Sequence, residues 1–337
     1  MDRPIRLGIT MGDPAGIGPE VVVKVFADPA VRSVPNLVVL GDAGYLRRAA
    51  EQLNVDFPCP AVSSCTPLEE LPPGAVVWDF ANAKDVPPGR PSREGGVASL
   101  QYIERAVDLA LAGRLDAIVT GPINKMALVL AGTQWPGHTE FLAQRTHTRH
   151  PVMMLVGRSL RVALVTTHLA LRKVPGALNV ENVLATLRVT DREMKSLFGI
   201  AAPRLAVCGL NPHASDGGRF GNEEARVIEP AIRKAKESGI AVSGPHPPDA
   251  VFHQAAGGRY DAVIAMYHDQ GLIPLKLLHF EDAVNVTLGL PIIRTSVDHG
   301  TAYDIVGRGQ ANAASMLAAI RLAAGLAARR RAISSDR

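Results

Sequence analysis

Aromatic residues are scarce in this chain and make up only 4% of its 337 residues. A core must therefore be built from alanine, valine, leucine and isoleucine, which favours a parallel sheet covered by helices over a β-sandwich. Charged residues account for 20% and hydrophobic residues for 47%, as in an ordinary globular enzyme. The length exceeds what one ordinary core needs and indicates one large or two medium domains.

Cysteine is rare as well, and long apolar runs are missing. The three cysteines form no CxxC pair, which argues for a reducing compartment and against a disulfide framework. The N-terminus reaches Asp13 before any long apolar stretch, so it does not resemble a signal peptide. No run is long enough to cross a bilayer. We therefore expect a soluble, cytoplasmic protein without a membrane partner.

The net charge of +4 does not indicate a nucleic-acid partner. The excess is confined to the C-terminus, which we expect to be a frayed, solvated tail. No RNA- or DNA-binding module is visible elsewhere in the sequence. The residues that carry the excess are Arg321, Arg329, Arg330, Arg331 and Arg337, opposed by Asp336.

Short β-branched runs alternate with longer helical stretches, which predicts βαβ units and a mostly parallel sheet. The expected fold is a three-layer α/β/α arrangement. Expected strands are 6–11, 37–40, 75–80, 116–120, 152–156, 161–166, 204–208 and 261–266, and expected helices are 18–26, 95–112, 181–197, 222–236 and 313–328. Proline-rich breaks are expected at 86–93 and 245–248.

The N-terminal loop MGDPAGIGPE lacks the usual nucleotide signatures. Its glycines do not match GxGxxG spacing, and no GK[ST] follows, so neither a Rossmann fingerprint nor a Walker loop is present. Pro19 suits the first turn of a helix. A backbone anion site and a purely structural turn both remain open for this loop.

Three histidines each follow the end of an apolar strand: His168 after RVALVTT, His213 after RLAVCGLNP, and His268 after DAVIAMY. Ligands bind at the carboxyl edge of an open α/β sheet. Imidazoles delivered by three loops suit Zn²⁺ or a similar divalent ion with positions left open for substrate. The neighbouring Asp216 and Asp269 fit either partners that orient these rings or ordinary turn residues.

Cationic and polar side chains lie near the same expected edge. Lys125 follows a strand, and His138 and Thr139 begin a helix whose free N–H groups suit an anionic substrate. Arg294 follows an apolar run, so it is well placed to clamp a carboxylate or phosphate, with Lys276 as a second positive charge.

Seven motifs together resemble the 4-hydroxythreonine-4-phosphate dehydrogenase family of pyridoxal phosphate biosynthesis. They cover nearly the whole chain and read GDPAGIGPE, TGPINK, GHTEF, TTHLALR, GLNPHASDGG, MYHDQGL and GLPIIRTSVDHGTAYDI. The resemblance implies the isocitrate/isopropylmalate dehydrogenase-like fold with two domains. We expect residues 1–130 with 290–337 to form the first and 131–289 the second, which carries the metal loops and the dimer interface.

The resemblance further implies a homodimer with a shared active site. It implies that the three histidines bind one divalent metal (Zn, Mg or Co), with ligands shared between subunits. The implied cofactor is NAD or NADP, with Asp298, His299, Gly300 and Asp304 in the cofactor loop. The implied substrate ligands are His138, Thr139, Lys276, Asn285 and Arg294. The general base stays open among Lys125, His138 and Asp249.

The implied reaction is oxidation of the C3 hydroxyl of 4-phosphooxy-L-threonine, followed by loss of CO₂ to give 3-amino-2-oxopropyl phosphate. An alternative is a dehydrogenase of 4-phospho-D-threonate or 4-phospho-D-erythronate, which differs by one group at C2. An alternative of another class is a phosphate acyltransferase on the same fold, which has no use for three metal histidines.

Overall fold

The computed structural model describes residues 4–32, 34, 36–135 and 137–335. Asp336 and Arg337 of the expected basic tail lie outside these residues. The chain forms two compact units, residues 1–148 with 290–331 and residues 149–289 with 332–337. Among the described residues, no helix is both long and apolar enough to span a membrane.

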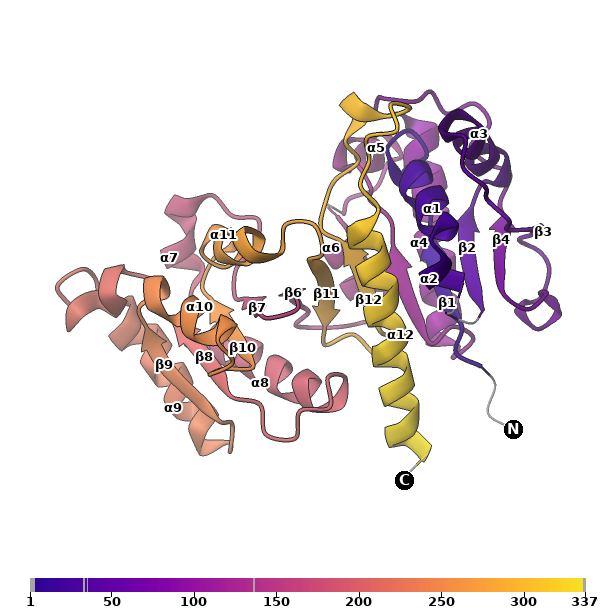
Figure 1. Cartoon of the computed structure of the whole chain (residues 1–337). Coiled ribbons are helices and arrows are strands. Elements are labelled where there is room, and N and C mark those ends of the chain that lie inside the picture. Colours follow the sequence, from indigo (N-terminus) through magenta and orange to yellow (C-terminus); the bar gives the residue numbers. More distant parts are fainter. Residues whose placement is uncertain (1–3, 33, 35, 136, 336–337) are drawn as a thin grey trace. The chain divides into compact units, whose positions relative to one another are not determined.

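The first unit is a six-stranded parallel sheet in the order β3-β4-β2-β1-β5-β12, with helices on both faces (Figure 1). Its central strands are buried along their whole length, as their unbroken apolar sequences predict. Its strands are β1 (Leu7–Thr10), β2 (Leu37–Gly41), β3 (Ala61–Ser63), β4 (Ala75–Asp79), β5 (Ala117–Thr120) and β12 (Arg294–Val297).

The helices of this unit begin where the sequence supplies caps. Ser92 accepts a hydrogen bond from Gly95 N–H and caps α4, and Pro19 occupies the first turn of α1 as expected. The helices are α1 (Gly18–Ala27), α2 (Pro29–Arg32), α3 (Ala43–Leu53), α4 (Arg93–Leu111), α5 (Lys125–Leu130), α6 (His138–Arg145) and α12 (Ala314–Ser335).

Two expectations for this unit need correction. The chain leaves it after Thr148 rather than after residue 130, because α6 stays attached to α4 through an ion pair between Arg145 and Asp108 (2.7 Å). The expected frayed C-terminus is wrong: α12 continues to Ser335, and the Arg331 guanidinium binds the Asp116 carboxylate at 2.6 Å.

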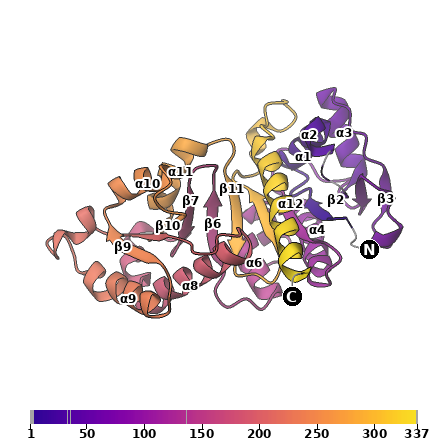
Figure 2. The ribbon, with the colours of Figure 1, turned by 60° about the horizontal axis from the view of Figure 1, so that its bottom comes forward.

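The second unit has strand order β11-β6-β7-β10-β8-β9. β6 pairs antiparallel with both β11 and β7, and the remaining pairs are parallel, which confirms a mostly parallel fold. Figure 2 shows α10 and α11 on one face of these strands and α8 and α9 on the other. Its strands are β6 (Val152–Val156), β7 (Arg161–Leu164), β8 (Leu205–Cys208), β9 (Val242–His246), β10 (Ala262–Ala265) and β11 (Val284–Leu288).

The apolar core of this unit lies between these strands and the helices α10 and α11. Val251 and Phe252 of α10 pack with Leu272 and Leu275 of α11 against side chains of the strands. The break expected at 245–248 is in fact the end of β9 and the start of α10; β9 tolerates its proline because it is an edge strand. The helices are α7 (Val174–Ala177), α8 (Val180–Ser196), α9 (Glu229–Glu237), α10 (Pro248–Ala256) and α11 (His268–His279).

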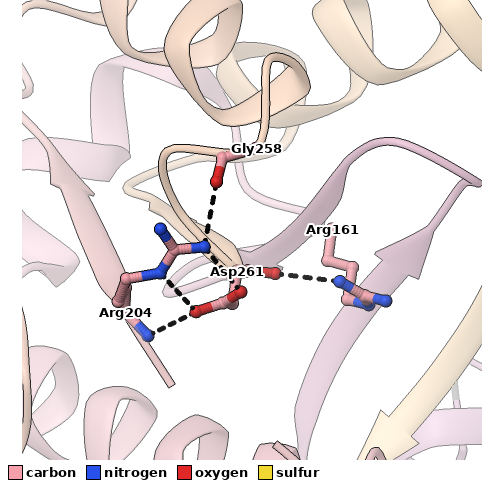
Figure 3. Close-up of polar contacts among 4 residues, drawn as sticks. All are labelled: Arg161, Arg204, Gly258 and Asp261. Carbon is pink, nitrogen blue, oxygen red and sulfur yellow. Dashed lines mark hydrogen bonds and ion pairs between the residues drawn. The ribbon is translucent and has the colours of Figure 1, made fainter. Parts of the chain in front are cut away.

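Asp261 braces the amino ends of three strands of the second unit (Figure 3). Its carboxylate accepts hydrogen bonds from the backbone N–H, Nε and Nη2 of Arg204 at 2.7, 3.0 and 3.1 Å. Its carbonyl accepts a bond from Arg161 at 3.3 Å. These contacts, above all the hydrogen bonds from the Arg204 side chain, lower the pKa of Asp261. This end of the strands is therefore fixed, and the opposite, carboxyl end carries the loops with the three histidines.

Candidate functional site

Two of the three predicted metal histidines meet at the carboxyl edge of the second unit. His168 follows β7, and His268 is the first residue of α11 after β10. The two strand ends are tied together because the hydroxyl of Thr166 donates to the carbonyl of Met266 at 2.7 Å. The ring centres of His168 and His268 lie 5.6 Å apart, with planes tilted by 43°.

This spacing fits a shared divalent ion. Two imidazoles bound tetrahedrally to one Zn²⁺ have ring centres about 5 Å apart, given Zn–N bonds near 2 Å. The Asp269 carboxylate lies 2.7 Å from Nδ1 of His268, which leaves Nε2 of that ring for a ligand. Asp269 thus makes the contact expected of a carboxylate that orients a ligating histidine. Asp216 instead faces Arg219, with Nη1 of that arginine 3.5 Å from the carboxylate.

The third histidine, His213, is held in an unusual turn. Four consecutive non-glycine residues, His213 to Asp216, have positive φ angles of 54°, 53°, 72° and 45°. Each such residue costs about 1–2 kcal/mol relative to a right-handed conformation. Backbone strain of this kind persists only where the surroundings impose it, and it concentrates at functional sites.

Within one chain, His213 does not join the other two rings. Among the described residues, no group of three histidine, cysteine, aspartate or glutamate side chains converges as a metal would require. His213 lines an 830 Å³ cavity together with Asp249 and with two neighbours of His268, Tyr267 and Asp269. The donor chemistry of the pair His168–His268 fits a divalent ion.

The remaining candidates of the second unit do not all lie at that edge: Asp249 follows the end of β9, whereas Asn285 lies at the amino end of β11, level with the start of β7. Asp249 is exposed in the first turn of α10. Lys276 lies on α11 with its ammonium 5.8 Å from the ring centre of Phe280. Asn285 lies on β11, opposite Leu155 of β6. Lys276 and Asn285 are both half-buried.

In the first unit, Arg294 is buried beneath a threonine. The guanidinium is 2% exposed, and its Nε and Nη2 donate to Oγ1 of Thr120 at 3.1 and 2.7 Å. Burial lowers the pKa of Arg294 to about 9, which still leaves it charged at neutral pH. Two hydrogen bonds to one oxygen fix the plane of the guanidinium. Thr120 therefore helps to hold Arg294 in place.

His138 begins α6 in the same unit, as expected from the sequence. Burial, and next the charge of Arg294, lower the pKa of His138 well below its ordinary value, so the ring is neutral at pH 7. Its Nε2 is buried and has no hydrogen-bond partner among the described residues. Thr139 follows in the first turn of α6. Lys125, exposed at the start of α5, extends toward this helix: a methyl group at Gly137 would lie 3.9 Å from its Cε.

The predicted cofactor loop, Asp298 to Asp304, is braced by the N-terminal loop. Tyr303 donates to the buried carboxylate of Asp13 at 2.5 Å, and Ile17 N–H donates to Thr301 O at 2.9 Å. Burial raises the pKa of Asp13. Ile17 uses its N–H for this internal hydrogen bond, and the whole loop MGDPAGIGPE is buried. Both observations favour a structural turn over a backbone anion site at this loop. The hydrogen bonds of Thr301 and Tyr303 to the N-terminal loop fix the segment that contains His299, Gly300 and Asp304.

Ser159, His279 and Asp282 form a hydrogen-bonded chain away from these loops. Ser159 Oγ lies 2.8 Å from His279 Nε2, and Asp282 lies 3.2 Å from Nδ1. The geometry resembles a serine hydrolase triad. However, the backbone N–H of Ser159 also donates to Nε2 at 3.3 Å, and the ring packs against Gly157. The histidine therefore locks the β6–β7 hairpin to the end of α11.

Comparisons with known proteins decide the family. The model of the pyridoxal phosphate biosynthetic protein PdxA matches residues 33–323. The chain belongs to this family. It is 48% identical over 335 residues to the 4-hydroxythreonine-4-phosphate dehydrogenase of Desulforapulum autotrophicum, with 96% of this chain and 95% of that protein covered. It is 45% identical over 324 residues to the D-threonate 4-phosphate dehydrogenase of Salmonella typhimurium, with 95% and 98% covered.

Solved structures agree with the fold. The crystal structure of 4-hydroxythreonine-4-phosphate dehydrogenase from Klebsiella pneumoniae superposes with a TM-score of 0.87 at 42% identity, covering 96% of this chain and 98% of that one. A terephthalate 1,2-cis-dihydrodiol dehydrogenase from Burkholderia xenovorans gives 0.65 at 30% identity, covering 96% and 98%. The family and the fold class predicted from the motifs are confirmed.

Sequence reasoning named the site residues but missed those that hold them. Thr120 ends the expected strand 116–120 and begins the motif TGPINK, but the sequence assigns it no function. Tyr303 lies in the motif GLPIIRTSVDHGTAYDI, and the sequence does not indicate its contact with Asp13. One signal pointed to the contact between Thr120 and Arg294. Thr120 ends β5, and Arg294 begins β12, the strand that pairs with β5. The partner of Asp13 lies 290 residues away, and no local pattern announces it.

Proposed function

We propose that this chain is an NAD- or NADP-dependent, divalent-metal-dependent dehydrogenase of 4-phosphooxy-L-threonine in pyridoxal 5'-phosphate biosynthesis. In this reaction C3 gives up its hydrogen as hydride to NAD or NADP and the C3 hydroxyl gives up its proton to a base, which leaves the ketone 2-amino-3-oxo-4-phosphooxybutanoate. This β-keto acid then loses CO₂ to give 3-amino-2-oxopropyl phosphate. Membership of the PdxA family, together with paired His168 and His268 rings at the carboxyl edge, carries the proposal.

The proposed metal site consists of His168, His268 and His213, with these ligands shared between the two subunits of a dimer. When bound there, a divalent ion (Zn, Mg or Co) supplies Lewis-acid polarisation of the substrate hydroxyl, and the nicotinamide accepts the hydride. Asp269 accepts the Nδ1 proton of His268 and so presents Nε2 outward. Asp249 and Lys125 stay candidates for the general base beside His138.

The substrate ligands are Arg294, His138 and Thr139 of the first unit and Lys276 and Asn285 of the second. Arg294 is charged and its plane is fixed, which suits bidentate binding of a phosphate or carboxylate. The neutral His138 ring offers Nε2, which has no hydrogen-bond partner among the described residues, for a hydrogen bond with the substrate. Asp298, His299, Gly300 and Asp304 form the cofactor loop in this proposal.

We further propose a cytoplasmic homodimer with a shared active site. Helix α11 begins with His268 and exposes large apolar side chains, among them Ile273 (67%), Leu277 (84%) and Phe280 (77%). An apolar face of this kind marks an interaction surface. A second copy of the chain is the partner that the resemblance implies. Size-exclusion chromatography with light scattering tests it, and a monomer at micromolar concentration contradicts it.

A second substrate has specific support, because one relative at 45% identity is named for D-threonate 4-phosphate. The test measures NADH formation with 4-phospho-L-threonine, 4-phospho-D-threonate and 4-phospho-D-erythronate, each with NAD and NADP. We expect the highest kcat/KM for 4-phospho-L-threonine. A higher value for either sugar-acid phosphate would make the chain a catabolic dehydrogenase. No absorbance change with any of them would favour an acyltransferase.

A further inference from the structure

We infer that Glu224 is a positioning residue that holds the His213 loop in the conformation in which His213 binds the metal. The inference rests on the proposed function, since it presupposes a metal at His213. Glu224 lies away from the histidines in the sequence and matches none of the motifs that identify the family. Its carboxylate is 1% exposed, so it cannot be a solvated surface charge.

The Glu224 carboxylate accepts three hydrogen bonds from the segment that leads into the His213 turn. Its Oε1 accepts the backbone N–H groups of Leu210 and Asn211, both at 2.8 Å. Its Oε2 accepts the side-chain amide of Asn211 at 2.9 Å. Three N–H donors satisfy the buried carboxylate, and a charge buried without such bonds would be too costly to keep. The bonds fix the two residues that immediately precede Pro212 and His213.

The turn that follows needs this support, because it is left-handed at four non-glycine positions. Ala214 N–H donates to Asn211 O at 3.1 Å. Asn211 therefore binds both the Glu224 carboxylate and the backbone of the turn. On the other side, the backbone of Ala214 lies so close to Gly209 that a Cβ there would sit 2.7 Å from Ala214 Cα. The loop is therefore clamped between Gly209 and the Glu224 carboxylate.

A second amide connects this clamp to the other histidines. Gln270, two residues after His268, donates to Gly209 O at 2.8 Å and accepts the Met266 N–H at 2.7 Å. The buried Gln270 side chain thus connects the carboxyl end of β8 to the carboxyl end of β10. Glu224 itself begins a π-helical turn, Glu224–Ile228, a local irregularity that is frequent at functional sites.

The test compares Co²⁺ affinity of the full-length, metal-free protein by titration of the cobalt absorption bands. The variants are Glu224→Gln, which keeps the volume but replaces one acceptor oxygen with a donor, and Glu229→Gln, the same change at an exposed carboxylate five residues on. Loss of a residue that orients a metal ligand weakens metal affinity by about 10–100-fold. We expect that loss for Glu224→Gln, and less than about twofold for Glu229→Gln by the same reasoning.

Thermal unfolding of the metal-free proteins separates positioning from a purely structural role. A lower Tm of Glu224→Gln with cobalt affinity unchanged, measured well below that Tm, overturns the inference. Where Glu224→Gln does not fold, Asn211→Ala removes the amide that donates to Oε2 of Glu224 and to Glu223, and leaves both backbone bonds to Oε1 in place. Unchanged cobalt affinity in that variant overturns the inference equally. His213→Ala is the reference: if it loses affinity while Glu224→Gln does not, only the inference fails. If the wild type binds no Co²⁺, the proposed function fails with it.

Discussion

Replacing Thr120 with valine tests how Arg294 is held. The substitution keeps the shape of the side chain and removes the oxygen that accepts two hydrogen bonds from the guanidinium. Leaving buried donors of a charged group without that acceptor costs about 1–3 kcal/mol. We expect the free energy of unfolding to fall by about 2 kcal/mol in urea denaturation, within that range.

The same substitution also removes the two hydrogen bonds that fix the orientation in which the Arg294 guanidinium binds its ligand. If half of that energy is lost from the enzyme–substrate complex, the KM for the phosphorylated substrate rises about fivefold, because 1.4 kcal/mol corresponds to a factor of ten. Thr295→Val is the matched control: Thr295 is also fully buried, but its hydroxyl donates to Ala319 O. An equal KM for both variants would refute the role given to Thr120.

Three further changes test other contacts. Asp269→Asn removes the carboxylate at His268 and should weaken cobalt affinity about tenfold, read by the same titration. Tyr303→Phe removes the bond to Asp13 and should raise the KM for NAD while leaving the cobalt affinity unchanged. Asp261→Asn should destabilise the fold at pH 7 and by a smaller amount at pH 3, read by urea denaturation at both pH values.

The sign of the Asp261 prediction follows from its lowered pKa. A carboxyl group with a folded-state pKa below its unfolded value stabilises the fold above the unfolded pKa, near 4, and loses that contribution as pH falls through the folded pKa. An equal difference between variant and wild type at both pH values would contradict it. For the other two, unchanged cobalt affinity in Asp269→Asn and an unchanged KM for NAD in Tyr303→Phe are the contradicting results.

The strands that the sequence predicted are those with continuous apolar runs. Val152–Val156 matches the structure residue for residue, and the other seven differ by one or two residues at their ends. The missed strands lack that signal: β3 has three residues, β9 contains Gly244 and Pro245, and β11 and β12 are separated only by the five residues 289–293. Helix α11 was hidden because its sequence contains both Gly271 and Pro274.

The sequence predicted the candidate residues that directly follow an apolar strand. It did not predict the contacts between segments that are far apart in the sequence. The position after an apolar strand located His168 and His268, whose rings the structure brings together. The same rule located His213 but not its left-handed turn, which contacts outside the local sequence impose. Arg294 and Thr120 are 174 residues apart, so only the folded sheet reveals that one holds the other.

Metal removal tests the central claim most directly. NADH formation from 4-phospho-L-threonine is followed before chelation, after chelation and dialysis, and after Zn²⁺, Mg²⁺ or Co²⁺ is added back. The account predicts that turnover disappears with the metal and returns with at least one of the three ions. Undiminished turnover in the metal-free protein would contradict it.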